Sequence, residues 1–435
     1  MARSISSVSC IRRFYSLFRF TQKNIVKRQP YVEEFSIPLQ SWCRTVLVWP
    51  NGGQDRKVLP MRIGIPKEIK NHEQRVGLTP GSVSELTRRG HSVLVQADAG
   101  VGIGASDADF VTAGAEIAPD APAVFDGSEM IVKVKEPLAV ERAMLREDHT
   151  LFTYLHLAPD AEQTKGLVAS GATCIAYETV TDDMGGLPLL APMSKVAGRM
   201  SIQAAANYLQ APNGGSGKLI GGVPGVPPAH VVIIGGGVVG QHGAEMAIGL
   251  GGNVTILDRN NHILDHCEQR WGAAVTTLYS TTAVLEEAVA SADVVIGAVL
   301  VKGDTAPKLV TAEMVRGMRA GSVLVDVAID QGGAFETSHA TTHQDPVYIV
   351  DDVVHYAVAN MPGAVPLTST HALNNATLPF VLALADLGPK AAMMAMPHLR
   401  NGLNVSAGRI TEPHVADALG YDFTATDDAV AALAA

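Results

Sequence analysis

A strand–helix–strand pattern with three spaced glycines occupies residues 231–258, VVIIGGGVVGQHGAEMAIGLGGNVTILD. An apolar β-branched run leads into Gly235, Gly237 and Gly240, and a second apolar run ends on Asp258. The first glycine permits a tight turn, the second lets the backbone approach a pyrophosphate, and the third lets helix and strand pack closely. The helix N-terminus attracts phosphates, and the acid can accept hydrogen bonds from a ribose. The pattern predicts a nicotinamide or flavin dinucleotide site; an ordinary βαβ turn without a ligand is the alternative.

Length and composition favour a two-domain α/β protein. The chain has 435 residues, 47% of them hydrophobic and 17% charged, which is typical of parallel α/β folds. A net charge of −10, with no basic stripe after residue 60, argues against a nucleic-acid partner. Four well-separated cysteines without C-x-x-C spacing indicate a reducing compartment such as the cytoplasm, with no disulfide framework and no metal site. We find no uninterrupted apolar stretch of about 18 residues and predict no membrane span.

Residues 1–60 differ in charge from the rest of the chain. They carry ten Lys/Arg and three Asp/Glu, whereas residues 61–435 carry 23 basic and 40 acidic side chains. The first 32 residues hold no acid and include IRRFYSLFRF, a composition typical of a mitochondrial presequence, which would imply a matrix location. The interpretation we favour is that translation starts at Met61 and that residues 1–60 are spurious and disordered. Both interpretations exclude residues 1–60 from the predicted fold.

Strand and helix patterns alternate from Met61 onward. Five strand patterns separated by helices predict a parallel sheet: 61–66, 91–97, 129–135, 151–156 and 172–178. A long helix pattern at 189–210 precedes the glycine unit, and further buried-strand patterns follow at 292–300, 322–330 and 347–350. From about residue 367 the pattern becomes helical. We therefore predict two doubly wound parallel-sheet (Rossmann-like) domains, in which residues 189–366 bind the dinucleotide and are inserted into a substrate domain of residues 61–188 plus 367–435.

Polar residues at strand ends are candidates for chemistry, because open parallel sheets bind ligands beyond the carboxyl ends of their strands. Lys135, His156 and Asp330 each end a predicted strand, and Arg75 lies in the polar loop after the first strand. Individually they have simpler explanations: a solvated rim lysine, a hydrogen-bonded histidine and a turn-forming aspartate before Gly-Gly. Together they suit a small anionic substrate, since arginine can bind a carboxylate while lysine and histidine polarise a carbonyl or imine.

Blocks spread over the chain from Met61 to its end make the identification specific. They are MRIGIPKEIKNHEQRVGLTP (61–80), VKVKEP (132–137), HLA (156–158), YETV (177–180), LLAPMSKVAGRMS (189–201), the glycine unit, IGAVLVKGDTAPKLV (296–310), VDVAIDQGG (325–333) and VANMPGAVPLTST (358–370). In this order they resemble the alanine dehydrogenase/transhydrogenase family. The resemblance implies reversible oxidative deamination of L-alanine to pyruvate and ammonium with NAD, by a homo-hexamer.

The resemblance also implies roles for individual residues. Arg75 and Lys135 would bind the substrate, and His156 and Asp330 would form the acid/base pair. Oxidation at Cα gives an iminium to which water must add, which requires a group that exchanges protons near neutral pH, as histidine does. The implied cofactor contacts are Ser194, Gly235, Gly237, Val238, Val239, Gly240, Asp258, Ser280, Val299, Leu300, Val327, Ala328, Ile329, Asp330, Val358, Ala359, Asn360 and Met361.

One position departs from the family pattern. Members often carry a basic residue about five positions after the ribose-binding acid, where this chain has Ile263. Asp258 would repel a 2′-phosphate, so the expected cofactor is NAD, while the neighbouring Arg259 leaves some NADP use open. Three alternatives remain: the NAD-binding part of a proton-translocating transhydrogenase, a saccharopine-forming relative, and a non-catalytic NAD-binding regulator. The presence of Lys135, His156 and Asp330 argues against the last.

Overall fold

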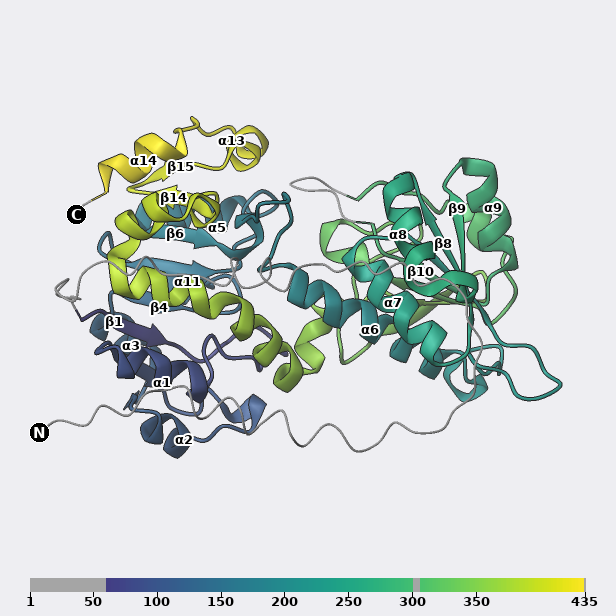
Figure 1. Ribbon diagram of the computed structural model, residues 1–435, viewed down its shortest axis with the longest axis horizontal. Coiled ribbons are helices and arrows are strands. Elements are labelled where there is room, and N and C mark those ends of the chain that lie inside the picture. Colours follow the sequence, from purple (N-terminus) through teal and green to yellow (C-terminus); the bar gives the residue numbers. More distant parts are fainter. Residues whose placement is uncertain (1–59, 300–305, 434–435) are drawn as a thin grey trace, which may run out of the picture. The chain divides into compact units, whose positions relative to one another are not determined.

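The structure is a computed structural model that describes residues 60–299 and 306–433 (Figure 1). Apart from Pro60, the N-terminal segment 1–60 lies outside the described residues, and so does Leu300, one of the expected cofactor contacts. The described chain forms two sheets, one of eight strands and one of seven. The predicted α/β class with two parallel-dominated sheets is therefore confirmed.

The eight-stranded sheet takes strands from both ends of the described chain, in the order β15-β14-β6-β5-β4-β1-β2-β3. Strands β1 to β6 are parallel, whereas β14 is antiparallel to β6 and β15 antiparallel to β14. The sequence patterns missed β3, which has three residues, and the two C-terminal strands. The bounds are β1 (Arg62–Ile65), β2 (Ser92–Gln96), β3 (Glu116–Ala118), β4 (Met130–Val132), β5 (Thr150–Thr153), β6 (Thr173–Ala176), β14 (Leu403–Ser406) and β15 (Arg409–Ile410).

Helices that accompany this sheet begin where the sequence supplies capping groups. Thr79 accepts a hydrogen bond from the Ser82 amide at the start of α1, and Pro80 occupies the first turn, where its missing N–H costs nothing. Asp160 caps α5 in the same way, and Gly171 ends that helix in the left-handed conformation. The helices are α1 (Pro80–Arg88), α2 (Asp107–Thr112), α3 (Ala121–Gly127), α4 (Ala139–Arg142), α5 (Ala161–Ser170), α11 (Pro366–Ala395), α12 (Pro397–Arg400), α13 (Pro413–Leu419) and α14 (Thr426–Ala432).

The seven-stranded sheet has the order β12-β13-β11-β10-β7-β8-β9, and only β12 is antiparallel to its neighbour. The strand order reverses between β7 and β10, which is the switch point where doubly wound sheets bind nucleotides. The strands are β7 (His230–Ile234), β8 (Asn253–Asp258), β9 (Val275–Tyr279), β10 (Val294–Gly297), β11 (Val323–Asp326), β12 (Val347–Val350) and β13 (Val353–Tyr356). The helices between Ala191 and Arg316 are α6 (Ala191–Tyr208), α7 (Val238–Gly249), α8 (Asn261–Trp271), α9 (Thr282–Ser291) and α10 (Ala312–Arg316).

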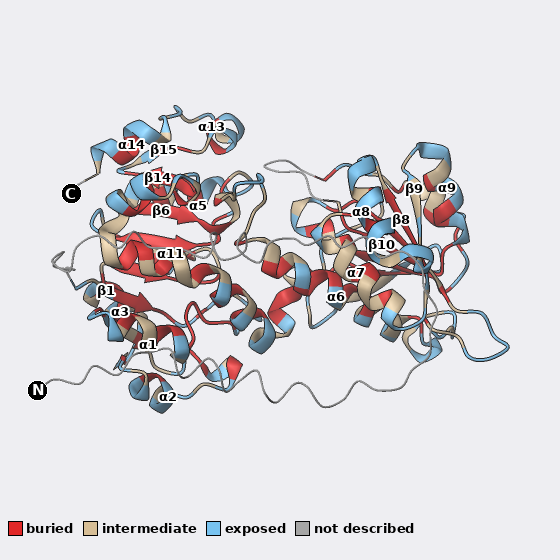
Figure 2. Ribbon diagram, viewed as in Figure 1, coloured by how far each residue is buried: buried red, intermediate tan, exposed pale blue. Residues whose placement is uncertain are grey.

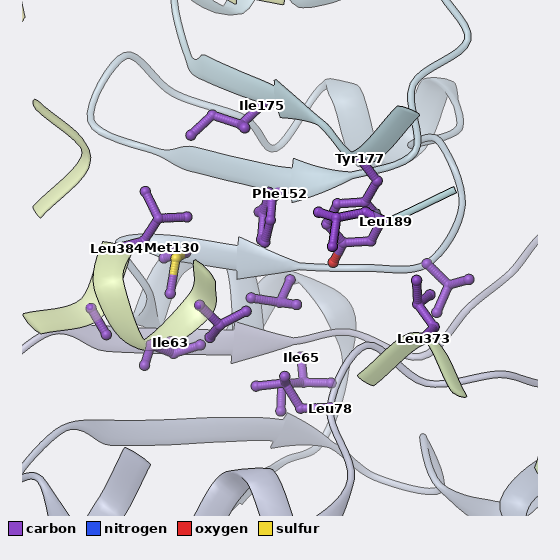
Figure 3. Close-up of a cluster of buried hydrophobic side chains, with 14 of the residues drawn as sticks. Ile63, Ile65, Leu78, Met130, Phe152, Ile175, Tyr177, Leu189, Leu373 and Leu384 are labelled. Carbon is purple, nitrogen blue, oxygen red and sulfur yellow. The ribbon is translucent and has the colours of Figure 1, made fainter. Parts of the chain in front are cut away.

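Helix α11 completes the core of the eight-stranded sheet. Figure 3 shows Leu384 of α11 beside Met130 and near Ile63 of the strands, with Leu373 of the same helix at the other end of the cluster. Figure 2 shows many of the strands buried and the outer faces of many helices exposed. Helix α11 therefore belongs to the hydrophobic core built by the first strands.

By length and composition α11 could also cross a membrane. Its packing accounts for its apolar composition, because Val381 and Leu384 are fully buried in the core of the eight-stranded sheet. Asp386 accepts a hydrogen bond from Arg89 at 2.6 Å and pairs with His91 at 2.9 Å. Gly388, with φ of 76° and ψ of 161°, divides the element into two helical segments. Such a helix is typical of the core of a globular domain.

Candidate active site

The glycine turn between β7 and α7 has the geometry that a dinucleotide requires. Gly235 has a φ of +100°, and a Cβ there would lie 2.8 Å from the Ala298 carbonyl oxygen. A Cβ on Gly240 would clash with the carbonyl oxygen of Gly235, so only glycine lets α7 pack this close to β7. A Cβ on Gly237 would meet nothing within 4 Å, and this N-cap residue makes no side-chain capping hydrogen bond. The turn is closed on its protein side and open at Gly237, where a phosphate can approach the first turn of α7.

Asp258 is held at the end of β8 beside this turn. Its Oδ2 accepts a hydrogen bond from the Gly236 amide at 2.7 Å, and its Oδ1 accepts one from the Asn260 amide at 2.8 Å. A carboxylate has about four lone-pair sites, so each oxygen retains a site for a hydroxyl donor. The residue is half-buried, and its carboxylate is fixed by two backbone amides. The residues present therefore fit the adenosine half of a dinucleotide.

Most of the other described residues expected at the cofactor lie beyond carboxyl ends of strands in the same sheet, whereas Ser194 lies on α6 and Val238 and Val239 on α7. Ser280 follows β9, and its amide donates to the Asp258 carbonyl at 3.0 Å. The Cγ2 of Val299 would lie 3.3 Å from a Cβ on Gly235. Residues 327–330 and 358–361 follow β11 and β13. Ser194 lies on α6, one helical turn before Gly198. A Cβ on Gly198 would clash with the Val239 carbonyl oxygen of α7, so α6 and α7 pack closely near Ser194. Parallel strands thus bring Ser280, Val299 and the residues after β11 and β13 to one edge of the sheet.

Arg75 is buried and carries a carboxylate partner that the sequence patterns did not predict. Its Nε donates to Glu73 Oε1 at 2.7 Å, and one terminal nitrogen donates to Glu73 Oε2 at 2.5 Å. The same nitrogen donates to Asn360 Oδ1 at 2.8 Å, and the other approaches the Met193 sulfur at 3.0 Å. Burial opposes ionisation of Glu73, but the hydrogen bonds and charge of Arg75 lower its pKa to about 2. The two-pronged face expected to bind a substrate carboxylate is thus engaged by Glu73.

Asn360 connects Arg75 with Asp330. Its side-chain amide donates to Glu73 at 3.0 Å, and its backbone amide donates to Asp330 Oδ1 at 3.3 Å. The residue has a φ of +62°, which asparagine tolerates better than most side chains. A chain of hydrogen bonds therefore runs from Glu73 and Arg75 of the loop after β1 to Asp330 of the loop after β11.

Lys135 lies three residues beyond β4, close to a second buried carboxylate. Its Nζ is 3.8 Å from Glu136 Oε2, and Lys70 contacts the other oxygen of that carboxylate. Burial would raise the pKa of Glu136, but the charges of Lys135 and Lys70 lower it. The Lys135 carbonyl accepts a hydrogen bond from Thr153 at 3.1 Å, which ties the segment to β5. The lysine charge is thus partly balanced, and its side chain is only 11% exposed.

An ionic triad lies underneath this segment. Lys133 is fully buried and donates to Glu141 at 2.6 Å and to Glu68 at 3.1 Å. The other Glu68 oxygen accepts hydrogen bonds from the Val134 amide at 2.6 Å and the Lys135 amide at 3.3 Å. Burial raises the pKa of Glu68 against the opposing charge of Lys133. The triad therefore fixes the backbone that carries Lys135.

His156 lies three residues beyond β5, not at the strand end itself. It has a φ of +50°, and its ring stacks on Tyr154 with centroids 5.8 Å apart and an interplanar angle of 6°. The imidazole is 45% exposed. Glu178 accepts the backbone amides of Leu155 and His156. The sequence pattern placed the strand end too late because apolar residues continue to Leu155.

Asp330 was predicted to end its strand, but it lies four residues beyond β11 in a 3₁₀ helix (Val327–Gln331), because β11 ends at Asp326. Asp326 is buried, and its carboxylate accepts amide hydrogen bonds from Ala328 at 3.2 Å, Ala334 at 2.9 Å and Phe335 at 3.3 Å. Burial raises the pKa of Asp326 despite these hydrogen bonds. Lys308 donates to the Phe335 carbonyl at 3.1 Å. The loop that carries Asp330 is thus held by hydrogen bonds to the buried Asp326 carboxylate and by the hydrogen bond from Lys308.

A cavity of about 220 Å³ opens beside Arg75. Its lining includes Lys67, but also Glu68, Glu73 and Asp98. The cationic Lys67 and Arg75 thus stand against three carboxylate-bearing side chains, so the charge of the lining does not by itself favour an anion. The sequence patterns missed three supporting carboxylates: Glu73, Glu178 and Asp326. Two signals could have indicated them. Glu178 and Asp326 lie at or just after strand ends, and Glu73 lies two residues before Arg75.

Two domain families match the described chain. Residues 64–197 match the family described as alanine dehydrogenase/PNT, N-terminal domain, and residues 201–413 match its C-terminal domain. An alanine dehydrogenase of Halomonas elongata is 58% identical over 83% of this chain and 98% of its own length. One of Mycolicibacterium smegmatis is 53% identical over 84% of this chain and 98% of its own. A solved L-alanine dehydrogenase structure is 53% identical, with a TM-score of 0.80 over 83% of this chain and 99% of its own.

Proposed function

Because this chain belongs to the alanine dehydrogenase/PNT family, we propose that it catalyses the NAD-dependent, reversible oxidative deamination of L-alanine to pyruvate and ammonium. The observation that carries the proposal is the series of hydrogen bonds from Glu73 and Arg75 through Asn360 to Asp330. It joins Arg75, the proposed ligand of the substrate carboxylate, to Asp330, a proposed proton-transfer group, through the backbone and side chain of Asn360.

The cofactor site comprises the glycine turn and the strand ends around it. The open face of Gly237 and the first turn of α7 would hold the pyrophosphate, and Asp258 would hold the adenosine ribose. Bound NAD supplies the acceptor for the hydride that leaves the alanine Cα. Asp258 disfavours a 2′-phosphate, so the proposed preference is NAD over NADP. Ser194, Ser280, Val299 and residues 327–330 and 358–361 would line the remainder.

Lys135 and Arg75 would bind the alanine carboxylate. The Arg75 fork is engaged and its charge balanced by Glu73, so Arg75 would contribute one terminal nitrogen, and Lys135 would contribute its ammonium group. His156 would exchange the proton of the attacking water at its exposed imidazole, and Asp330 would assist from the opposite loop. The stacking on Tyr154 leaves the edge of the imidazole available for this exchange.

The test is to follow NADH absorbance with purified protein, NAD and L-alanine, and then the reverse reaction with pyruvate, ammonium and NADH. We expect turnover in both directions, with NADP a poor substitute. A parallel assay for hydride exchange between NADPH and an NAD analogue, without any amino acid, tests a transhydrogenase role. Folded protein that binds NADH but turns over no alanine would refute the proposal.

The remaining features of the proposal concern organisation. We propose a substrate domain of residues 61–188 plus 367–435 and an NAD-binding domain of residues 189–366. The strands of one sheet, which lie within 62–176 and 403–410, and those of the other, within 230–356, support this division. We also propose a homo-hexamer and a cytoplasmic location. Light scattering of the purified protein measures the oligomeric state, and the N-terminal residue of the mature protein distinguishes a start at Met61 from a cleaved presequence.

A further inference from the structure

The parallel ladder between β5 and β6 stops at the pair Thr153 and Ala176. Beyond it, the amides of Leu155 and His156 have the Glu178 carboxylate as their acceptor, at 3.1 Å and 2.5 Å respectively. This carboxylate comes from the 3₁₀ helix (Tyr177–Thr179) that follows β6, and its side chain is 14% exposed. Glu178 therefore replaces the missing strand neighbour at the point where β5 turns into the candidate site.

The backbone of His156 needs such a constraint. A φ of +50° lies in the left-handed region, which side chains other than glycine seldom adopt unless the surrounding structure holds them there. Tyr154 contacts one face of the imidazole and is itself fixed by a hydrogen bond from its hydroxyl to the Leu189 carbonyl at 2.6 Å. The Nδ1 of His156 is 3.9 Å from Glu178 Oε1, which is beyond hydrogen-bond distance. The carboxylate thus acts on the backbone of His156, and the imidazole edge stays available.

We propose that Glu178 is a positioning residue for the reaction: it holds His156 in the left-handed conformation that presents the imidazole to the substrate. This inference rests on the proposed function, in which His156 exchanges the proton. It predicts that loss of Glu178 lowers the turnover rate and leaves cofactor binding intact. The reason is that Glu178 follows β6 of the eight-stranded sheet, whereas the glycine turn belongs to the seven-stranded sheet.

The test compares Glu178→Ala and Glu178→Gln with the wild type. A misplaced catalytic group costs about 100-fold, so we expect kcat of the Ala variant to fall by about that factor with KM for L-alanine and NADH affinity within about twofold of wild type. The Gln variant should retain more activity than the Ala variant, because its carbonyl oxygen can still accept one of the two amides. Amide hydrogen exchange of a peptide covering residues 151–158 should be faster in the Ala variant.

Glu412→Ala is the matched control. Glu412 caps α13 by accepting the Val415 amide at 2.8 Å, so the substitution removes a comparable carboxylate-to-amide bond outside the site. We expect it to lower stability slightly and leave kcat unchanged. A folded Glu178→Ala protein with a kcat within about threefold of wild type would overturn the inference. Equal loss in Ala and Gln, with NADH affinity falling in parallel, would indicate a structural role only and also overturn it. If the wild type itself turns over no alanine, the proposed function fails, and unchanged exchange at residues 151–158 would then refute the positioning role separately.

Discussion

Replacing Glu73 with glutamine should remove one of the strongest electrostatic contributions to folding near the candidate site. The Glu73 side chain is fully buried, and its two oxygens bind the Arg75 guanidinium at 2.7 and 2.5 Å. The substitution preserves the shape of the side chain and removes its charge. Arg75 would then remain buried with only one oxygen acceptor from residue 73, which is costly because breaking a buried ion pair leaves an uncompensated charge.

The size of the effect follows from the Glu73 pKa. The hydrogen bonds and charge of Arg75 outweigh the cost of burial and lower this pKa from 4.5 to about 2. At about 1.4 kcal/mol per pKa unit, ionised Glu73 contributes about 3 kcal/mol to the free energy of unfolding. Because the folded pKa is lowered, the contribution is fully present above the unfolded value of 4.5 and is lost as pH falls toward 2. About half of it should remain at pH 3.

Urea unfolding of both proteins between pH 7 and pH 3 measures this contribution. The difference in unfolding free energy between wild type and Glu73→Gln isolates one carboxyl group from the many others that titrate in acid. We expect about 3 kcal/mol at pH 7, declining as the pH approaches 3. Glu85→Gln serves as a control, because the Glu85–Arg88 pair is exposed on α1 and should contribute at most about 0.5 kcal/mol.

A difference that stays constant from pH 7 to pH 3 would refute the reasoning. It would mean that Glu73 contributes through packing or hydrogen bonding alone and not through its ionisation. A difference at pH 7 no larger than that of Glu85→Gln would also refute it, because the burial of the pair would then have no energetic consequence.

Three further results are expected. His156→Ala and Asp330→Ala should each abolish alanine turnover, which in the wild type should be strongest at alkaline pH, while NADH affinity stays near wild type; a near-normal rate in either would remove its assigned role. Gly240→Ala should lower the thermal unfolding temperature because its Cβ has no space, whereas Gly237→Ala should leave that temperature nearly unchanged and weaken NADH binding, and the reverse pattern would contradict the described turn. Asp326→Asn should lower kcat by about 10- to 100-fold, because both Asp326 oxygens accept backbone amides of the Asp330 loop and asparagine keeps only one acceptor oxygen; an unchanged kcat would show that this carboxylate is dispensable.

The fold was largely predictable because its signals are local. β-branched runs such as 231–234 alternate with capped helices, and the glycine spacing at 235–240 reports a turn whose steric demands few other sequences meet. Elements with weak local signals were missed. The strand β3 has three residues at a sheet edge, and β14 and β15 pair antiparallel with strands far away in sequence.

The candidate site divides in the same way. The types and strand-end positions of Lys135, His156 and Asp330 were readable, but each lies three or four residues beyond its strand. Those extra residues turn the backbone and direct the side chain, and their conformation depends on distant groups such as Glu178. No local pattern indicates which buried carboxylate will accept a given backbone amide.

The sequence by itself therefore determined the α/β architecture, the dinucleotide turn and the set of residues able to exchange protons, since each follows from periodicity, spacing and side-chain chemistry. Tertiary structure decided which of these side chains have hydrogen-bonding atoms left for a ligand and which are engaged by other residues. Arg75 was readable as a carboxylate ligand, but in the folded chain Glu73 engages its fork and Asn360 joins it to Asp330. The strength of a charge depends on its burial and on its partners, and partners that come from different loops are brought together only when both sheets have formed.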